Sequence, residues 1–221
     1  MELASYIDHT YLKPDARTAD IEKLCEEARA HQFRTVCVNS VWVKSCSDLL
    51  QDCHVGISAV CGFPLGAAAS AAKAFEAELA VDDGASEIDM VMQIGKLLDG
   101  QYKDVEQDIR DVVNAVNGSA IVKVILETGF LSDEHIITAC KIAEQAGAHF
   151  VKTSTGFGPG SADVRHVKLM REAVSDAVQV KASGGIRDHV AAVRMIEAGA
   201  SRLGTSSGVA ILQGRAGEQS Y

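Results

Sequence analysis

Three lysines stand inside short apolar segments of the sequence, where a charged side chain is costly. Lys123, Lys152 and Lys181 follow one another at intervals of 29 residues, with mostly apolar neighbours on both sides. Taking an ammonium group out of water costs several kcal/mol unless it is paired or neutralised. A buried amine beside other positive charges has a lowered pKa, which lets it attack a carbonyl and form a Schiff base. The lysines therefore predict carbonyl chemistry.

Asp89 has a similar setting, in Ser86-Glu87-Ile88-Asp89-Met90-Val91. A carboxylate there balances the lysine charges and moves protons during a reaction. The structural alternative for Asp89 is an ion pair with a lysine. For each lysine it is an ion pair with a carboxylate on a neighbouring strand, or a frayed strand end with the ammonium group in solvent.

Glycine-rich segments follow two later strands, in Ser183-Gly184-Gly185-Ile186-Arg187 and in Gly204-Thr205-Ser206-Ser207-Gly208. Without a Cβ, the backbone N–H groups of glycine approach an anion closely, and a guanidinium adds positive charge. These segments predict a phosphate site at Gly184, Gly185, Arg187, Gly204, Ser206 and Ser207. Ordinary tight turns are the alternative.

The second of these segments also matches the G-x-S-x-G pattern around the nucleophilic serine of some hydrolases. In that fold an acid and then a histidine follow the serine. After Ser206 this chain has no histidine, and its only acid is Glu218. The sequence disfavours a serine hydrolase.

Short β-rich segments alternate with amphipathic segments along the whole chain, which indicates βα units and a parallel sheet. Apolar residues three and four apart predict helices around 21–28, 105–116 and 136–143. Helix N-caps are expected at Thr18, Ser132 and Asp188, and C-terminal glycines at 84, 118, 147 and 199. The eight predicted strands are 7–10, 35–38, 55–61, 87–92, 121–126, 150–153, 178–182 and 201–205.

Eight βα units in 221 residues predict an α/β fold, a single-domain (β/α)₈ TIM barrel over residues 1–221. An open doubly wound sheet is the alternative, but the glycine-rich fingerprint expected after its first strand is missing. In a barrel, catalytic groups point inward at the C-terminal ends of strands. That rule adds Asp8, Thr10, Lys123 and Glu127 as residues lining the site. Cys37, at the end of an early strand, is a further candidate, and a buried structural thiol is its alternative.

Composition excludes several classes of partner. Thirty Asp and Glu against 21 Lys and Arg give a net charge of −9, the wrong sign for nucleic acid or an anionic membrane surface. No apolar leader or membrane-length apolar stretch is visible, so we expect a cytoplasmic protein. The six cysteines form no C-x-x-C pair and the seven histidines are scattered, so no metal centre is predicted.

Motifs in the same order along the chain resemble those of the 2-deoxyribose-5-phosphate aldolase family. They are Ile7-Asp8-His9-Thr10, Glu87-Ile88-Asp89-Met90-Val91-Met92, Lys123-Val124-Ile125-Leu126-Glu127-Thr128, Lys152-Thr153-Ser154-Thr155-Gly156-Phe157, Val180-Lys181-Ala182-Ser183-Gly184-Gly185-Ile186-Arg187 and Gly204-Thr205-Ser206-Ser207. The likeness spans nearly the whole chain, so coincidence is improbable.

This resemblance implies a TIM-barrel class I aldolase that reversibly cleaves 2-deoxy-D-ribose 5-phosphate to acetaldehyde and D-glyceraldehyde 3-phosphate, without metal or organic cofactor. It implies that Lys152 forms the Schiff base, that Lys181 lowers its pKa and that Asp89 relays protons. The phosphate would be held at the glycine-rich segments described above. A homodimer is expected from the family.

Two positions near the expected site stand apart. Tyr221, the last residue, resembles the C-terminal tyrosine with which the family assists proton transfer, and a disordered terminus is the alternative. Phe157 stands where some members of the family carry a lysine beside the phosphate, which removes one charge contact.

Two other functions remain open on the sequence alone. One is a sugar-phosphate isomerase that uses carboxylates without a Schiff base, and the other is a sugar-phosphate sensor that has lost turnover. Reductive trapping of a substrate on Lys152 separates the aldolase from both.

Overall fold

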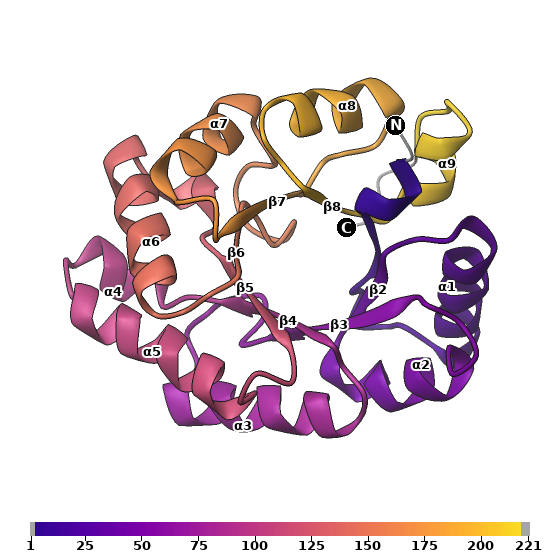
Figure 1. The fold of residues 1–221 in the computed structure, drawn as a ribbon, viewed down its shortest axis with the longest axis horizontal. Coiled ribbons are helices and arrows are strands. Elements are labelled where there is room, and N and C mark those ends of the chain that lie inside the picture. The colour runs from indigo at the N-terminus through magenta and orange to yellow at the C-terminus, as the bar shows by residue number, and fades with distance from the viewer. Residues whose placement is uncertain (1–2, 218–221) are drawn as a thin grey trace.

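The computed structural model describes residues 3–217, and its strands close into a parallel barrel, seen end-on in Figure 1. Strand order follows the chain, and β8 completes the ring by pairing with β1. The predicted TIM barrel is confirmed, and every strand end lies within one residue of its predicted place. The strands are β1 (Ile7–Tyr11), β2 (Thr35–Val38), β3 (Gly56–Cys61), β4 (Glu87–Val91), β5 (Ile121–Ile125), β6 (Phe150–Lys152), β7 (Gln179–Ser183) and β8 (Arg202–Thr205).

Helices surround the barrel in Figure 1 and cover its outer face. None of the helices within residues 3–217 is long and apolar enough to cross a membrane. The α-helices are α1 (Thr18–His31), α2 (Val43–Leu49), α3 (Ser70–Asp82), α4 (Ile94–Leu98), α5 (Tyr102–Ala115), α6 (Asp133–Gln145), α7 (Val164–Ala173), α8 (His189–Glu197) and α9 (Gly208–Leu212). Short 3₁₀ helices are η1 (Leu3–Tyr6), η2 (Ser40–Trp42) and η3 (Thr128–Phe130).

Two of the three predicted N-caps are confirmed. Ser132 Oγ accepts from His135 N at 3.3 Å, and Asp188 Oδ1 accepts from Ala191 N at 2.8 Å. The prediction for Thr18 is wrong, because α1 begins at Thr18 itself and Arg17 precedes it as the cap. The Asp20 carboxylate, at the third helical position, accepts from the Arg17 backbone N–H at 2.9 Å, which is the contact that the third residue makes in a capping box.

The two faces of the strands differ in chemistry. Outward residues such as Ile88, Val122 and Val124 are fully buried under the helices, and each stabilises the fold by about 1.5–3 kcal/mol. Residues of the opposite parity, such as Asp89 and Lys123, point into the barrel and are equally buried but charged. Apolar packing therefore lies between barrel and helices, and the interior carries the polar groups.

A buried ion pair joins α3 to α5. Lys73 and Asp108 have fully buried side chains, and Lys73 Nζ donates to Asp108 Oδ2 at 2.7 Å. The same ammonium donates to the Val91 carbonyl at 2.8 Å, at the end of β4, the strand that carries Asp89. The pair therefore ties two outer helices to the C-terminal end of a strand that bears a candidate site residue.

Replacing Asp108 with alanine is expected to destabilise the fold by about 3–5 kcal/mol, because it leaves the buried Lys73 ammonium without a carboxylate. Urea unfolding at neutral pH measures this change. Asp104→Ala is the control, since it breaks the surface pair of Asp104 and Lys96 and should cost no more than about 1 kcal/mol. Equal costs for both variants would mean that the Val91 carbonyl alone satisfies Lys73.

Candidate active site

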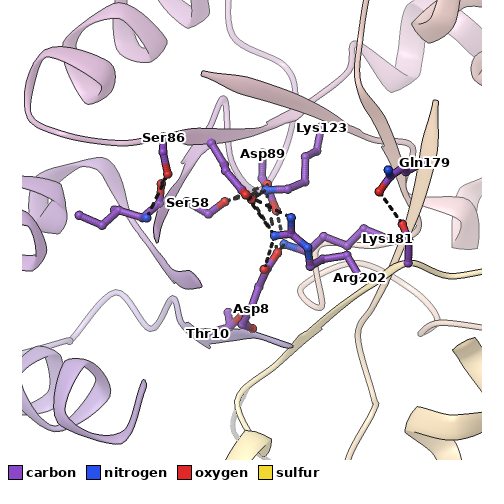
Figure 2. A network of polar contacts seen from close by, with 12 residues as sticks. Asp8, Thr10, Ser58, Ser86, Asp89, Lys123, Gln179, Lys181 and Arg202 are labelled. Atoms are coloured by element: carbon purple, nitrogen blue, oxygen red, sulfur yellow. Dashed lines mark hydrogen bonds and ion pairs between the residues drawn. The ribbon is translucent and has the colours of Figure 1, made fainter. Parts of the chain in front are cut away.

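Asp89 lies at the centre of a buried group of charged side chains inside the barrel. Its carboxylate accepts hydrogen bonds from Lys123 Nζ at 2.5 Å, Lys152 Nζ at 2.6 Å and Lys181 Nζ at 2.7 Å. Ser58 Oγ donates to the same carboxylate at 3.0 Å. Figure 2 shows Lys123 and Lys181 entering this group from their two strands. The three lysines noted in the sequence thus converge on the one acid noted with them.

A second set of contacts connects this group to the opposite side of the barrel (Figure 2). Arg202 donates to Asp8 at 2.7 Å and to Glu87 at 2.9 Å, and Lys181 donates to Asp8. Four cationic side chains therefore meet three carboxylates. With all carboxylates ionised, one neutral amine balances the group.

Lys152 is the amine best suited to be neutral. Burial lowers the pKa of its ammonium group, and the neighbouring Lys181 lowers it further, while Asp89 acts in the opposite direction. Lys152 also keeps 3% of its surface exposed, whereas Lys123 and Lys181 have none. The lysine with the lowered pKa is thus the one of the three that solvent reaches.

Lys181 and Asp89 stay charged. Burial alone would lower the pKa of Lys181, but Asp8 and Asp89 outweigh it and raise that pKa. Burial would likewise raise the pKa of Asp89, but Lys123, Lys152 and Lys181 hold it well below its usual range. A charged lysine and a charged carboxylate therefore flank the Lys152 amine.

The equal spacing of the three lysines in the sequence predicts equivalent positions on consecutive strands, and this prediction is wrong for Lys123. Lys152 pairs in register with Lys181, but Lys123 pairs with Phe150, two residues nearer the N-terminal end of β6. The stagger between β5 and β6 causes this offset, because the strands of a closed barrel are sheared against one another. Lys123 therefore lies deeper than the mouth, where it also contacts Glu87 at 2.6 Å.

The glycines predicted to hold phosphate lie at the ends of β7 and β8. Gly184 and Gly185 follow β7 with φ of 90° and 73°, in the left-handed region that favours glycine. Gly204 lies within β8, where a Cβ would stand only 3.0 Å from Lys181 Cε. Arg187 is exposed, and its carbonyl accepts from Gly217 N at 2.8 Å. The structure thus brings these glycines to the same end of neighbouring strands.

Ser206 and Ser207 line a cavity of about 550 Å³ beside the end of β1. Thr10 lines the same cavity and its hydroxyl donates to the Asp8 carbonyl at 2.9 Å. The Ser207 backbone N–H donates to Thr205 Oγ1 at 2.9 Å, which fixes the turn. Thr10 and the two serines therefore lie together, as the barrel arrangement predicts.

Cys37 is fully buried in β2 and packs with Leu12, Val60 and Phe63. Burial raises the pKa of its thiol, so the side chain is neutral. All six cysteines are free thiols. Within residues 3–217, no three His, Cys, Asp or Glu side chains form a group that could hold a metal ion.

Sequence reasoning missed two members of the buried group, Arg202 and Ser58. Arg202 shares its strand parity with Gly204, and Ser58 is a polar residue inside an apolar strand, so both carried a signal. Glu127, which the barrel rule predicts at the C-terminal end of a strand, is 2% exposed and directly follows β5. Tyr221 lies outside the described residues.

Comparison with known proteins places this geometry in a family. The model of the DeoC/LacD family aldolases matches residues 3–214. A deoxyribose-phosphate aldolase from Bdellovibrio bacteriovorus is 56% identical over the full length of both chains. The solved deoxyribose phosphate aldolase of Aeropyrum pernix is 36% identical, with a TM-score of 0.89 over 96% of this chain and 89% of its own. The chain belongs to the DeoC/LacD family of aldolases.

Proposed function

We propose that this aldolase reversibly cleaves 2-deoxy-D-ribose 5-phosphate to acetaldehyde and D-glyceraldehyde 3-phosphate through a Schiff base on Lys152. The observation that carries the proposal is the buried Lys152 amine of lowered pKa, hydrogen-bonded to Asp89 at 2.6 Å. We infer the identity of the substrate from the relatives named deoxyribose-phosphate aldolase.

The first step joins Lys152 Nζ to the aldehyde carbon, C1. The neutral amine adds to the carbonyl, the carbinolamine loses water, and an iminium ion results. Lys181 stays protonated beside it, so its charge favours the neutral form of Lys152 before attack. Asp89 lies within hydrogen-bond reach of the reacting nitrogen and supports proton transfer to and from the carbinolamine.

The second step breaks the bond between C2 and C3. A base, which we assign to Asp89 acting through a water, removes the C3 hydroxyl proton. The bonding electrons then move toward the iminium nitrogen, giving an enamine and D-glyceraldehyde 3-phosphate. Protonation of the enamine at C2 and hydrolysis release acetaldehyde and restore the amine. The iminium accepts electrons that would otherwise sit on an unstabilised carbanion. We assign assistance in the protonation of C2 to Tyr221.

The phosphate group of the substrate can be bound at a point remote from the reacting bond. We assign it to Gly184, Gly185, Arg187, Gly204, Ser206 and Ser207, since backbone N–H groups and a guanidinium suit a phosphate. Binding there orients C1 toward Lys152. Phe157 packs against Phe63 at a ring distance of 5.4 Å and supplies no charge, so one phosphate contact expected in some relatives is missing.

Replacing Lys181 with methionine is expected to move the pH dependence of imine formation to higher pH. Lys181 lowers the pKa of Lys152, so its loss raises that pKa and leaves less neutral amine at neutral pH. Each unit of increase lowers the neutral fraction about tenfold. Borohydride trapping of acetaldehyde, followed between about pH 6 and pH 10, measures the shift. Lys168→Met, at an exposed position, is the control and should leave the pH dependence of trapping unchanged. An unchanged pH dependence in Lys181→Met as well would contradict the role of Lys181.

Incubation with 2-deoxyribose 5-phosphate tests the reaction as a whole. We expect acetaldehyde release and, after borohydride, a covalent adduct on Lys152. Isomerised sugar without an adduct would identify an isomerase, and tight binding without turnover would identify a sensor. Membership of an aldolase family favours carbon–carbon cleavage over both.

Assembly and location complete the proposal. We expect a homodimer in the cytoplasm, with no nucleic-acid or membrane partner and no organic cofactor. The Aeropyrum pernix relative is described as a tetramer, so self-association occurs among the relatives. Light scattering of the purified chain measures its own state.

A further inference from the structure

Glu127 has a backbone conformation that few non-glycine residues adopt. It directly follows β5 with φ of 55° and ψ of 62°, in the left-handed region. The backbone on both sides of it is fixed to β6, because Leu126 N donates to the Lys152 carbonyl and Thr128 N to the Thr153 carbonyl. The left-handed turn sends the Glu127 side chain toward the segment that follows β6. Such conformations persist where the surrounding contacts hold them, and they concentrate at functional sites.

The Glu127 carboxylate is buried, and among residues 3–217 its hydrogen bonds come from Thr155. The Thr155 backbone N–H donates at 3.2 Å to Oε1, and the Thr155 hydroxyl donates to Oε2. That hydroxyl in turn accepts from Phe157 N at 3.0 Å. Burial raises the pKa of Glu127, and these hydrogen bonds act against the rise. One carboxylate thus fixes the first three residues of the segment 155–162, which we call the β6 loop.

Close backbone contacts lock the β6 loop to the same turn. A Cβ on Gly158 would stand 2.8 Å from Glu127 Oε2, and a Cβ on Gly129 would overlap the Pro159 carbonyl. The loop therefore passes directly over Glu127 and η3, with no room for a side chain between them.

The far end of the β6 loop reaches the candidate phosphate site. Ala162 N donates to the Gly184 carbonyl at 2.9 Å, and a Cβ on Gly185 would stand 2.8 Å from Ser161 Cβ. The conformation of the Gly184-Gly185 turn is thus set partly by the β6 loop packed against it. A displacement of the loop near Thr155 would be transmitted to this turn through eight residues or fewer.

We propose that Glu127 is a positioning residue that holds the β6 loop, and through it the Gly184-Gly185 turn, in the conformation that binds the phosphate group of the substrate. Glu127 then acts on phosphate affinity and leaves imine formation at Lys152 untouched. The phosphate role of the turn rests on the proposed function, but affinity for inorganic phosphate can be measured without any turnover.

Thr155→Val tests the contact without removing the charge of Glu127. Valine keeps the shape of threonine and lacks the hydroxyl, so the bond to Oε2 is lost. We expect the affinity for inorganic phosphate, measured by titration calorimetry, to fall about tenfold or more, the scale of one hydrogen bond to a charged acceptor. Thr155→Ser restores the hydroxyl and should bring the affinity back to within about threefold of wild type.

Thr128→Val is the matched control on the same turn. Thr128 is 1% exposed, and its hydroxyl has no hydrogen-bond partner among the described residues, so its loss should change phosphate affinity little. Should Thr155→Val fail to fold, Glu127→Gln carries the same test. The glutamine keeps an acceptor for the Thr155 N–H and weakens the hydroxyl contact.

Kinetics separate positioning from a direct effect on Lys152. In Thr155→Val we expect KM for 2-deoxyribose 5-phosphate to rise in step with the phosphate affinity, with kcat within about threefold of wild type. Borohydride trapping of acetaldehyde should proceed at the wild-type rate. Unchanged phosphate affinity in folded Thr155→Val, or slower trapping in step with weaker binding, overturns the proposal. A wild type that traps no acetaldehyde yet binds phosphate through Thr155 would refute the proposed function alone.

Discussion

Replacing Lys152 with alanine is expected to abolish the borohydride-trapped adduct and to lower kcat for cleavage by at least about 10⁴-fold, the scale seen when a catalytic nucleophile is removed. Without the amine no iminium forms, so the electrons of the breaking bond have no acceptor. Intact mass after treatment with acetaldehyde and borohydride measures the adduct as a gain of about 28 Da in wild type.

Two controls make this result specific to one amine. Lys168→Ala, at an exposed position, should still gain the mass and turn over normally. The second control is that the Lys152→Ala variant remains folded. We expect this because Asp89 keeps its contacts with Lys123 and Lys181 when the contact with Lys152 is lost. If the alanine variant gains the mass as fast as wild type, Lys123 or Lys181 forms the imine instead and our assignment is wrong.

Strand periodicity made the barrel predictable from the sequence. Segments such as Thr35–Val38 and Glu87–Val91 are β-rich runs that each follow a polar residue, and glycine turns such as Gly84 and Gly199 mark where helices end. The lysines and Asp89 were predictable for a different reason. A charge within an apolar strand is costly, so it stands out against its neighbours.

The register of the strands and the contacts between loops could not be predicted from the sequence. Strand stagger decides that Lys123 pairs with Phe150 while Lys152 pairs with Lys181, and no local pattern encodes that offset. Helix α3 was also hard to recognise, because it is alanine-rich and its buried face includes Lys73. The contact between Glu127 and Thr155 was not predicted, because the two residues lie 28 positions apart and only the paired ends of β5 and β6 bring them together.

Asp89→Asn is expected to separate imine formation from carbon–carbon cleavage. Asparagine keeps the shape of the side chain and removes the charge, so the proton relay that we assign to Asp89 is lost. Loss of a general acid–base group lowers kcat by about 10²–10⁴-fold. Imine formation should persist at a reduced rate. The carbinolamine loses one group that transfers protons, but Asp89 raises the pKa of Lys152, so its loss lowers that pKa and leaves more of the amine neutral. The pH dependence of acetaldehyde trapping should therefore move to lower pH, opposite to the shift in Lys181→Met.

The same substitution should change the stability of the fold as a function of pH. The folded-state pKa of Asp89 lies well below its usual value, so its stabilising effect is complete at neutral pH and is lost as the pH falls below about 4. Asp89→Asn removes that effect at neutral pH, where urea unfolding should show a loss of about 3–5 kcal/mol, and the acid dependence should flatten.

Ser58→Ala is the matched control for Asp89→Asn. It removes one hydrogen bond to the carboxylate but keeps its charge, so the pH dependence of trapping should stay near that of wild type. The two assays together locate the function of Asp89. Folded Asp89→Asn that cleaves substrate at the wild-type rate would assign the proton relay to another group. Loss of trapping and cleavage to the same extent would mean that the carboxylate is needed to form the imine rather than to break the bond.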